Sequence, residues 1–522
     1  MPRLVLVSNR VPASPNRQPA GGLATALSAA LKELGGMWFG WSGDTTDIPS
    51  GTARLHHCDN QTLATIDLSP TEHELYYNCF SNRALWPIFH GRADLATVHA
   101  EAYATYRSVN RKFADSLLPH LQHDDLIWVH DYHLIPLGAE LRRRGVRSAI
   151  GFFLHIPFPA PETFAALPWA HDLARALMDY DLVGFQTRTC QRNFREFVNQ
   201  KFAGFSGRPG QLPAGGFPRT EVHPVGIDAD YFATLAASEP VAEHASYLRN
   251  CLNGQSGIVG VERLDYSKGI AERFRAFEIL LRDSPDLAGQ VTLLQIAAPS
   301  RLGVPEYQQL KADLEALSGR INAELSHFGW TPICYLNRAF SHQQVAAMFR
   351  ACRVGLVTPL RDGMNLVAKE YVAAQDPTDP GVLILSAFAG SAAQLEEALI
   401  VNPYDAESMA SALRKALVMP LAERQARWQA LRKRIGTHNV HAWRRNFLRS
   451  LRESAHPAPG LKLHSLKTAT GPDSARPLPA PRWPARAGRP EIRPPQSFVP
   501  PEHLLQLDRG RASQTANRNR ED

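Results

Sequence analysis

The polar stretch at residues 360–370, LRDGMNLVAKE, has the residue types and spacing of an anion-binding turn that enters a helix. The letters DGMN favour a turn and a helix cap, and the letters LVAKE are good helix formers. The apolar residues 354–358 precede the turn and predict a short strand. This order would aim free backbone N–H groups and the positive end of a helix dipole at an anion, with Glu370 one turn further on. On spacing alone, an ordinary strand-to-helix connection with a capped start is the more common explanation.

Two more predicted strands end in polar residues that could do chemistry. Residues 125–129 predict a buried strand that runs into His-Asp-Tyr-His, which contains Asp131, and the apolar residues 149–154 run into His155. Parallel sheets bind ligands beyond the carboxyl ends of their strands, so these positions favour a site. One histidine after a strand is more often a structural residue, but two polar strand ends indicate a site more strongly.

A fourth strand end carries cations. Residues 257–261 predict a strand that continues into ERLDYSKGI, which contains Arg263 and Lys268. Two cations beyond a strand could be surface charges. Facing a diphosphate, they would neutralise the negative charge that develops on a leaving group.

Other candidates lie near the N-terminus. Arg10 follows the first predicted strand, and Gly21 and Gly22 precede an Ala/Leu-rich helix, which suits close approach to a phosphate. Dense aromatic residues usually mean core packing. Tyr77 and Trp86 are nevertheless candidates for sugar contacts, because a sugar face stacks well on an aromatic ring.

These strand ends require an α/β scaffold. Alternating strand and helix patterns predict a doubly wound domain at residues 1–245, a second at 246–454 that ends in closing helices, and a tail at 455–522. The tail contains 12 of the 39 prolines and few large apolar residues, so we expect it to be disordered. It holds 11 of the 57 Lys and Arg residues but 6 of the 50 Asp and Glu residues, so most of the net charge of +7 lies there.

Composition excludes several classes of protein. The chain is 44% hydrophobic and 20% charged, as in soluble globular proteins, and no apolar run approaches the ~20 residues of a membrane helix. Six scattered cysteines without a Cys-x-x-Cys pair and no signal-peptide pattern favour the cytoplasm. We found no metal-ligand cluster. Nucleic-acid binding through the basic tail is disfavoured, because it has few interleaved aromatic residues.

Read together, the letters RDGMNLVAKEY at residues 361–371 resemble the nucleotide-sugar loop of trehalose-6-phosphate synthases. Those enzymes are retaining glycosyltransferases of family 20 with the GT-B architecture, in which two Rossmann-like domains face a cleft. The resemblance covers about residues 1–450 through six or more motifs. One departure is Ala393-Gln394-Leu395, where the family more often has Asn-Glu-Leu.

The resemblance implies a role for each matching residue. The catalytic residues would be His155, Arg263 and Lys268. The acceptor, glucose 6-phosphate, would bind to Arg10, Tyr77, Asp131 and Arg301. The donor, UDP-glucose, would bind to Gly22, Arg263, Lys268, Phe340, Asp362, Leu366, Val367, Ala368, Lys369 and Glu370. Trp86 and Ile156 would set anomer selectivity.

The activity implied by the resemblance is retaining transfer of glucose from UDP-glucose to glucose 6-phosphate, which gives α,α-trehalose 6-phosphate and UDP in trehalose biosynthesis and stress protection. It would need no cofactor and no essential metal, and it implies a cytoplasmic homo-oligomer, a dimer or a tetramer, with no nucleic-acid or membrane partner. Two alternatives stay open: a glucosylglycerol-phosphate synthase that uses ADP-glucose, and a non-catalytic sugar-phosphate sensor.

Overall fold

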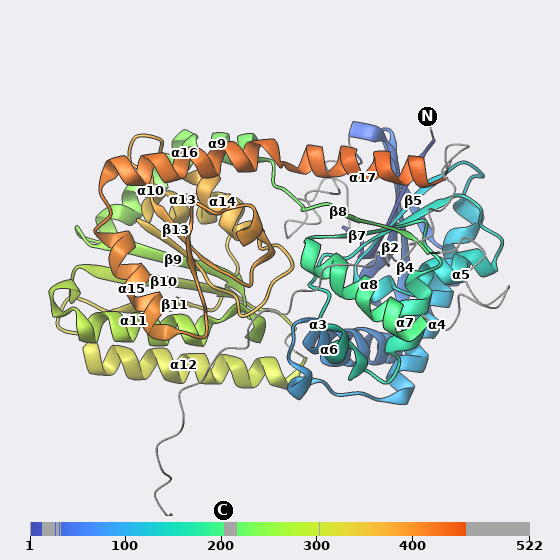
Figure 1. The fold of residues 1–522 in the computed structure, drawn as a ribbon, viewed down its shortest axis with the longest axis horizontal. Helices are drawn as coiled ribbons and strands as arrows, with labels where there is room; N and C mark the ends of the chain where they lie inside the picture. Colours follow the sequence, from blue (N-terminus) through green and yellow to red (C-terminus); the bar gives the residue numbers. More distant parts are fainter. Residues whose placement is uncertain are drawn as a thin grey trace, which may run out of the picture. The chain divides into compact units, whose positions relative to one another are not determined.

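The computed structural model describes residues 2–12, 27, 31, 33–202, 217–301 and 303–455, which form two sheets with helices around them (Figure 1). Two predictions lie outside the described residues: the disordered tail, apart from residue 455, and the role of Gly22. Within the described part, no helix combines the length and the apolar character needed to cross a membrane.

The first sheet has eight strands in the order β3-β4-β2-β1-β5-β6-β7-β8. Their bounds are β1 (Leu4–Arg10), β2 (Gly36–Thr45), β3 (Arg54–Cys58), β4 (Gln61–Leu68), β5 (Leu126–His130), β6 (Ala149–Phe153), β7 (Leu182–Phe185) and β8 (Arg219–Val222). Every pairing is parallel except that of β3 with β4. All residues of β5, β6 and β7 are buried, which explains why these strands are nearly continuous apolar runs in the sequence.

Helices cover this sheet and connect its strands. Their bounds are α2 (Pro70–Glu72), the π-helical η1 (His73–Leu85), α3 (Trp86–Phe89), α4 (Ala100–Leu117), α5 (Leu137–Arg143), α6 (Pro161–Ala165), α7 (Ala170–Leu177) and α8 (Arg188–Phe202). The start of α2 is fixed by a capping box, in which Ser69 accepts from the Glu72 backbone and the Glu72 side chain accepts from the Ser69 backbone.

The second sheet has six strands, all paired in parallel, in the order β11-β10-β9-β12-β13-β14. Their bounds are β9 (Ser256–Arg263), β10 (Val291–Ala298), β11 (Ile333–Leu336), β12 (Val354–Val357), β13 (Val382–Ser386) and β14 (Leu399–Val401). The order reverses between β9 and β12, as in a dinucleotide-binding fold. The first sheet reverses in the same way between β1 and β5. Two Rossmann-like doubly wound sheets, as predicted, are therefore confirmed.

Helices lie on both faces of the second sheet (Figure 1). Their bounds are α9 (Ala229–Ala237), α10 (Glu239–Cys251), α11 (Ile270–Asp283), α12 (Pro305–Leu325), α13 (His342–Ala351), α14 (Leu366–Ala374), α15 (Ala406–Leu417) and α16 (Leu421–Thr437), and they are followed by α17 (Val440–Ala455), which packs elsewhere. The predicted domain boundary at residue 245 falls inside α10. Val241 and Ala245 of that helix pack in the core of the second sheet, together with Phe232 of α9.

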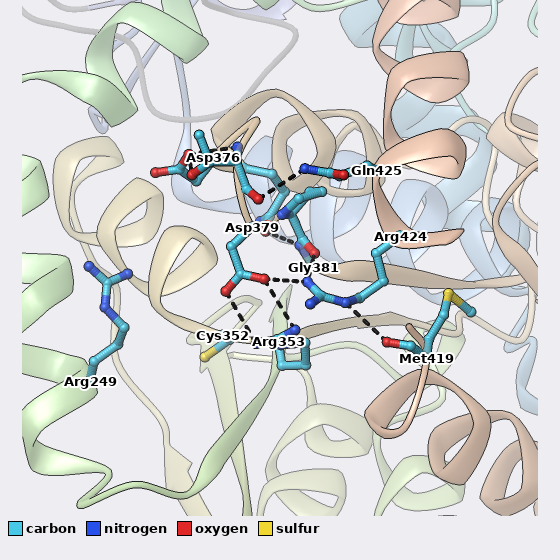
Figure 2. Close-up of polar contacts among 12 residues, drawn as sticks. Arg249, Cys352, Arg353, Asp376, Asp379, Gly381, Met419, Arg424 and Gln425 are labelled. Carbon is cyan, nitrogen blue, oxygen red and sulfur yellow. Dashed lines mark hydrogen bonds and ion pairs between the residues drawn. The ribbon is translucent and has the colours of Figure 1, made fainter. Parts of the chain in front are cut away.

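Arg424 of α16 anchors the segment that follows α14 (Figure 2). Its Nη1 donates to Asp379 Oδ1 at 2.6 Å and to the Pro380 carbonyl at 2.5 Å, and its Nε donates to the Met419 carbonyl. Arg353 also contacts the Asp379 carboxylate. These bonds join α16 to the connection between α14 and β13.

The last helix, α17, returns to the first sheet and packs against β6 and β7. Its Phe447 stacks on Trp128 of β5, with the ring centroids 4.4 Å apart. Glycines in the two strands admit this ring: a Cβ on Gly151 would lie 2.9 Å from the Phe447 ring, and one on Gly184 would lie 2.7 Å from it. Of the helices between residues 405 and 455, α17 therefore contacts the first sheet, whereas α15 and α16 pack on the second.

Phe447→Ala is expected to lower the free energy of unfolding by about 3–5 kcal/mol, because it leaves a cavity under a fully buried ring. Urea denaturation would measure the change, with Val418→Ala as the control, since Val418 is 65% exposed. A loss below about 1 kcal/mol for Phe447→Ala would show that α17 does not stabilise the first sheet.

Candidate active site

The candidate residues lie at the two points where the strand order reverses. Arg10 is the last residue of β1, and Asp131 follows β5 directly. Arg263 is the last residue of β9, and residues 358–365 connect β12 to α14. The carboxyl ends of strands at a reversal point leave room for a ligand, because the flanking connections run to opposite faces of the sheet.

Arg10 lies beside a row of aromatic rings. Its guanidinium lies 5.7 Å from the centre of the Trp41 ring. From Trp41 the row continues through His73 and Tyr77 to His133, with neighbouring ring centroids 5.2–5.7 Å apart. Burial lowers the pKa of His133 to about 3, with Arg301 and Arg263 adding to the effect, so this ring is neutral. The arrangement suits an anionic group at Arg10 and a sugar ring against the aromatic row.

Sequence reasoning identified Arg10 and Tyr77 of this row but missed Trp41, His73 and His133. The signal for Trp41 was the unusual density of aromatic residues at positions 38–41. Nothing local distinguishes His73, because its place in the row depends on the π-helical course of η1.

Asp131 has a strained backbone, with a φ of 75°. Its Oδ1 accepts a hydrogen bond from the backbone N–H of His155 at 3.2 Å, which ties the end of β5 to the end of β6. Burial raises the pKa of Asp131 to about 6, although backbone hydrogen bonds and Arg263 oppose the rise. The hydrogen bond from the backbone N–H of His155 holds the carboxylate in place beside that residue.

We predicted that Arg301 contacts the phosphate of the acceptor. In the structure, its side chain is buried in an ion pair with Asp265. Its Nη1 lies 2.7 Å from Asp265 Oδ2, and its guanidinium stacks 3.9 Å from the centre of the Trp86 ring. Tyr307 donates to the same carboxylate oxygen at 3.0 Å and also contacts Arg301. Burial alone would raise the pKa of Asp265, but Arg301, Lys268 and Arg263 lower it well below its usual range.

Trp86 belongs to this cluster too. Its ring is 4% exposed, its Nε1 donates to Asp265 at 3.4 Å, and the guanidinium of Arg263 lies 5.6 Å from its centre. Sequence reasoning did not identify Asp265 or Tyr307, although Asp265 stands in the motif that it read. The two residues matter because they fix where the Arg301 charge lies.

Lys268 and Asp362 form a close pair, with 2.5 Å between Nζ and Oδ2. Asn365 donates to the same oxygen at 3.1 Å. Burial alone would raise the pKa of Asp362, but Lys268 lowers it below its ordinary value. Arg263, by contrast, is exposed. The strand end of β9 therefore offers one paired and one accessible cation.

The turn before α14 lies directly against His155 of the first sheet. A Cβ on Gly363 would collide with the His155 carbonyl oxygen and with Ile156, so only glycine fits there. Asn365 caps the helix by accepting from the Ala368 N–H at 3.3 Å. The contact of Gly363 with His155 and Ile156 joins the end of β6 to the turn from which α14 begins, so the N-terminus of α14 lies close to His155.

Lys369 and Glu370 differ in their surroundings. Lys369 is 1% exposed, and its Nζ donates to the carbonyl of Val225 and to Gln394 Oε1, both at 2.7 Å, so its side chain is directed into the protein. Burial lowers the pKa of Lys369 to about 7. Burial and the nearby Glu262 raise the pKa of Glu370 to about 7.

Glu370 is expected to make the free energy of unfolding pH-dependent between pH 4.5 and about 7. Its ionised form is disfavoured in the fold, so the penalty is absent below the ordinary pKa of 4.5 and complete above the raised pKa. The free energy of unfolding should therefore fall as the pH rises through this window, by at most about 3 kcal/mol. Glu370→Gln should remove this part of the slope. Identical slopes for both proteins in urea denaturation would contradict the raised pKa.

The remaining predicted residues lie as follows. Ala368 is fully buried, Leu366 and Val367 are half-buried at the start of α14, and Ile156 is 7% exposed. Phe340 follows β11, and the guanidinium of Arg338 lies 4.6 Å from the centre of its ring. Among the described residues, no group of three or more His, Cys, Asp or Glu side chains is placed to hold a metal ion.

Comparison with known proteins agrees with this geometry. The model of glycosyltransferase family 20 matches residues 7–453. The trehalose-6-phosphate synthase of Enterobacter sp. (strain 638) is 48% identical over 457 residues, which is 87% of this chain and 96% of that protein.

Solved structures are similar over the same part of the chain. A Burkholderia xenovorans α,α-trehalose-phosphate synthase (UDP-forming) in complex with glucose-6-phosphate has a TM-score of 0.81 and 46% identity, covering 86% of this chain and 100% of that one. The E. coli trehalose-6-phosphate structure bound with UDP-2-fluoro glucose has a TM-score of 0.81 and 47% identity, covering 86% and 99%. The predicted GT-B architecture is thereby confirmed, and the chain belongs to glycosyltransferase family 20.

Proposed function

We propose that this protein transfers glucose from UDP-glucose to glucose 6-phosphate with retention of configuration, giving α,α-trehalose 6-phosphate and UDP. The similar B. xenovorans enzyme binds glucose-6-phosphate, and the similar E. coli structure binds a UDP-glucose analogue, which supports these two substrates. The observation that carries the proposal is the contact of Gly363 with His155. It supports a shared site in which an arginine and an aromatic row from one sheet would face a helix N-terminus and two cations from the other.

On the acceptor side, Arg10 would hold the phosphate and the row from Trp41 to His133 would lie against the sugar ring. On the donor side, Arg263, Lys268 and the N-terminus of α14 would meet the diphosphate, whose negative charge grows as the sugar departs. Positioning of two bound substrates and stabilisation of this charge would supply the rate enhancement.

The carboxylates of the site favour a mechanism without a covalent sugar intermediate. Retaining hydrolases use a carboxylate nucleophile near the anomeric carbon. Here Asp265 is paired with Arg301, Asp362 is paired with Lys268, and Asp131 accepts from the His155 backbone. We therefore propose front-face transfer, in which a donor phosphate oxygen takes the proton of the acceptor hydroxyl as the new bond forms.

A matrix of donors and acceptors tests the substrates. The purified protein would be incubated with UDP-, ADP- or GDP-glucose and with glucose 6-phosphate, glucose or glycerol 3-phosphate, and nucleotide release would be followed with and without EDTA. We expect the fastest release from UDP-glucose with glucose 6-phosphate, and we expect it to persist in EDTA. Preference for ADP-glucose with glycerol 3-phosphate would support the glucosylglycerol-phosphate alternative, and no release with any pair would support the sensor.

A further inference from the structure

His130 has no role in the proposed reaction, yet it lies directly behind His155. It is the last residue of β5 and is 0% exposed. Its Nδ1 lies 3.1 Å from Nε2 of His155, which itself is half-buried beside the turn at Gly363. A hydrogen bond between two ring nitrogens needs one donor and one acceptor, so the state of one ring fixes the state of the other.

Both rings are neutral in the fold. Burial lowers the pKa of His155 to about 3, and burial together with His155 lowers the pKa of His130 well below its ordinary value. The Asp131 carboxylate accepts a hydrogen bond from the backbone N–H of His155. Aromatic rings also contact the pair: Trp128 contacts His130, Phe153 contacts His155, and Trp443 contacts both rings. A neutral imidazole carries one N–H and one lone pair.

The surroundings of His130 Nε2 decide which of the two rings donates the hydrogen bond between His130 and His155. His130 Nε2 is buried and lacks a partner among the described residues, and the same holds for the indole N–H groups of Trp128 and Trp443. These two rings are close neighbours of His130, with centroids 4.6 and 6.4 Å away. An indole N–H can only donate. If His155 donated to His130, the hydrogen of His130 would stand on Nε2 and add a third unpaired buried donor to this group, which is unfavourable.

We propose that His130 is a positioning residue that donates from Nδ1 to His155 Nε2, and thereby fixes His155 in the tautomer that carries its hydrogen on Nδ1. His155 then presents an N–H donor to an acceptor oxygen of the bound substrate, and it offers no lone pair with which to take a proton. This assignment rests on the proposed function for the identity of the substrate, but the tautomer itself does not depend on which sugar is transferred.

Nitrogen-15 NMR of the full-length protein with labelled histidine tests the tautomer, with the His155 signals identified by their loss in His155→Gln. We expect the Nδ1–H form of His155 and no titration between about pH 6 and pH 8.5. The Nε2–H form in the wild-type protein would overturn the proposal. This readout stands even if the donor and acceptor matrix identifies other substrates.

Two variants of His130 test its effect on activity. His130→Phe keeps a ring but removes the donor, so His155 should populate both tautomers and kcat should fall roughly 10- to 100-fold, with the KM for glucose 6-phosphate within about twofold. His130→Asn can place an amide N–H near the position of Nδ1, and should restore kcat to within about fivefold.

The control is His223→Asn. His223 is also buried and also contacts α17, with its ring 5.3 Å from that of Phe447, but it lies away from His155. We expect it to leave the His155 signals unchanged. A purely structural role for His130 would lower the melting temperature and kcat equally in both His130 variants, without changing the His155 signals, and would overturn the proposal. If His130→Phe does not fold, the His155 tautomer in the wild-type spectrum and the kcat of His130→Asn test the proposal.

Discussion

Arg263→Ala is expected to lower kcat by roughly 10²- to 10³-fold while the melting temperature stays within about 1 °C of the wild-type value. The side chain is exposed at the end of β9, so its removal leaves no buried group unpaired. Its charge stands beside Trp86 and the Lys268–Asp362 pair, where we place the leaving diphosphate. Loss of a preorganised charge that stabilises the transition state affects kcat more than ground-state binding.

Steady-state kinetics and thermal melts of three variants would test this prediction. Arg275→Ala is the control, because it removes another exposed arginine, from α11 rather than from the strand end. Lys268→Ala should also lower kcat, but it leaves the Asp362 carboxylate without its partner and should destabilise the fold as well. A near-normal kcat for Arg263→Ala would show that this strand end does not meet the leaving group.

Arg10→Ala is expected to raise the KM for glucose 6-phosphate roughly 10- to 100-fold and to leave the KM for UDP-glucose within about twofold. Arg10 is exposed and lies over Trp41, at the first-sheet side of the site. A charge-assisted fork to phosphate contributes both affinity and orientation. For the same reason, plain glucose should be a poor acceptor with a lower kcat, because binding energy at the remote phosphate supports orientation at the reacting hydroxyl.

Arg301→Ala should behave differently from Arg10→Ala, although the two residues share a predicted role. Arg301 neutralises Asp265, whose side chain is 0% exposed. Loss of the Arg301 side chain should therefore lower the free energy of unfolding by about 3–5 kcal/mol and also weaken the binding of the acceptor. Double titrations of acceptor and donor, with thermal melts, would separate the two effects. If donor affinity collapses in Arg10→Ala while the acceptor KM is unchanged, Arg10 belongs to the donor half of the site.

The sequence could predict the features that depend on local pattern. The apolar runs at β5 and β6 end where polar residues begin, and that transition placed Asp131 and His155 correctly at strand ends. The two sheets followed from alternating strand and helix signals. The turn at residues 360–365 was recognised because its residue types form a turn and a cap within a few positions.

Other features depend on contacts between residues far apart in the chain, which a local pattern does not contain. The bond from Lys369 to the Val225 carbonyl spans 144 residues, so nothing near Lys369 indicated that its side chain is directed into the protein. Gln394, where the family more often has Glu, likewise shows its structural role only through the hydrogen bond that it accepts from Lys369. The burial of Arg301 required knowledge that Asp265, after β9, and Trp86, in α3, approach each other although they are 179 residues apart.

The product of the reaction tests the central claim most directly. The full-length protein would be incubated with UDP-glucose labelled with carbon-13 at the anomeric carbon and with glucose 6-phosphate, and the product would be examined by NMR and mass spectrometry. We predict one labelled disaccharide phosphate with an α,α-1,1 linkage, formed in equal amount with UDP. A β-configured labelled sugar, a different linkage, or free labelled glucose as the main product would contradict the account.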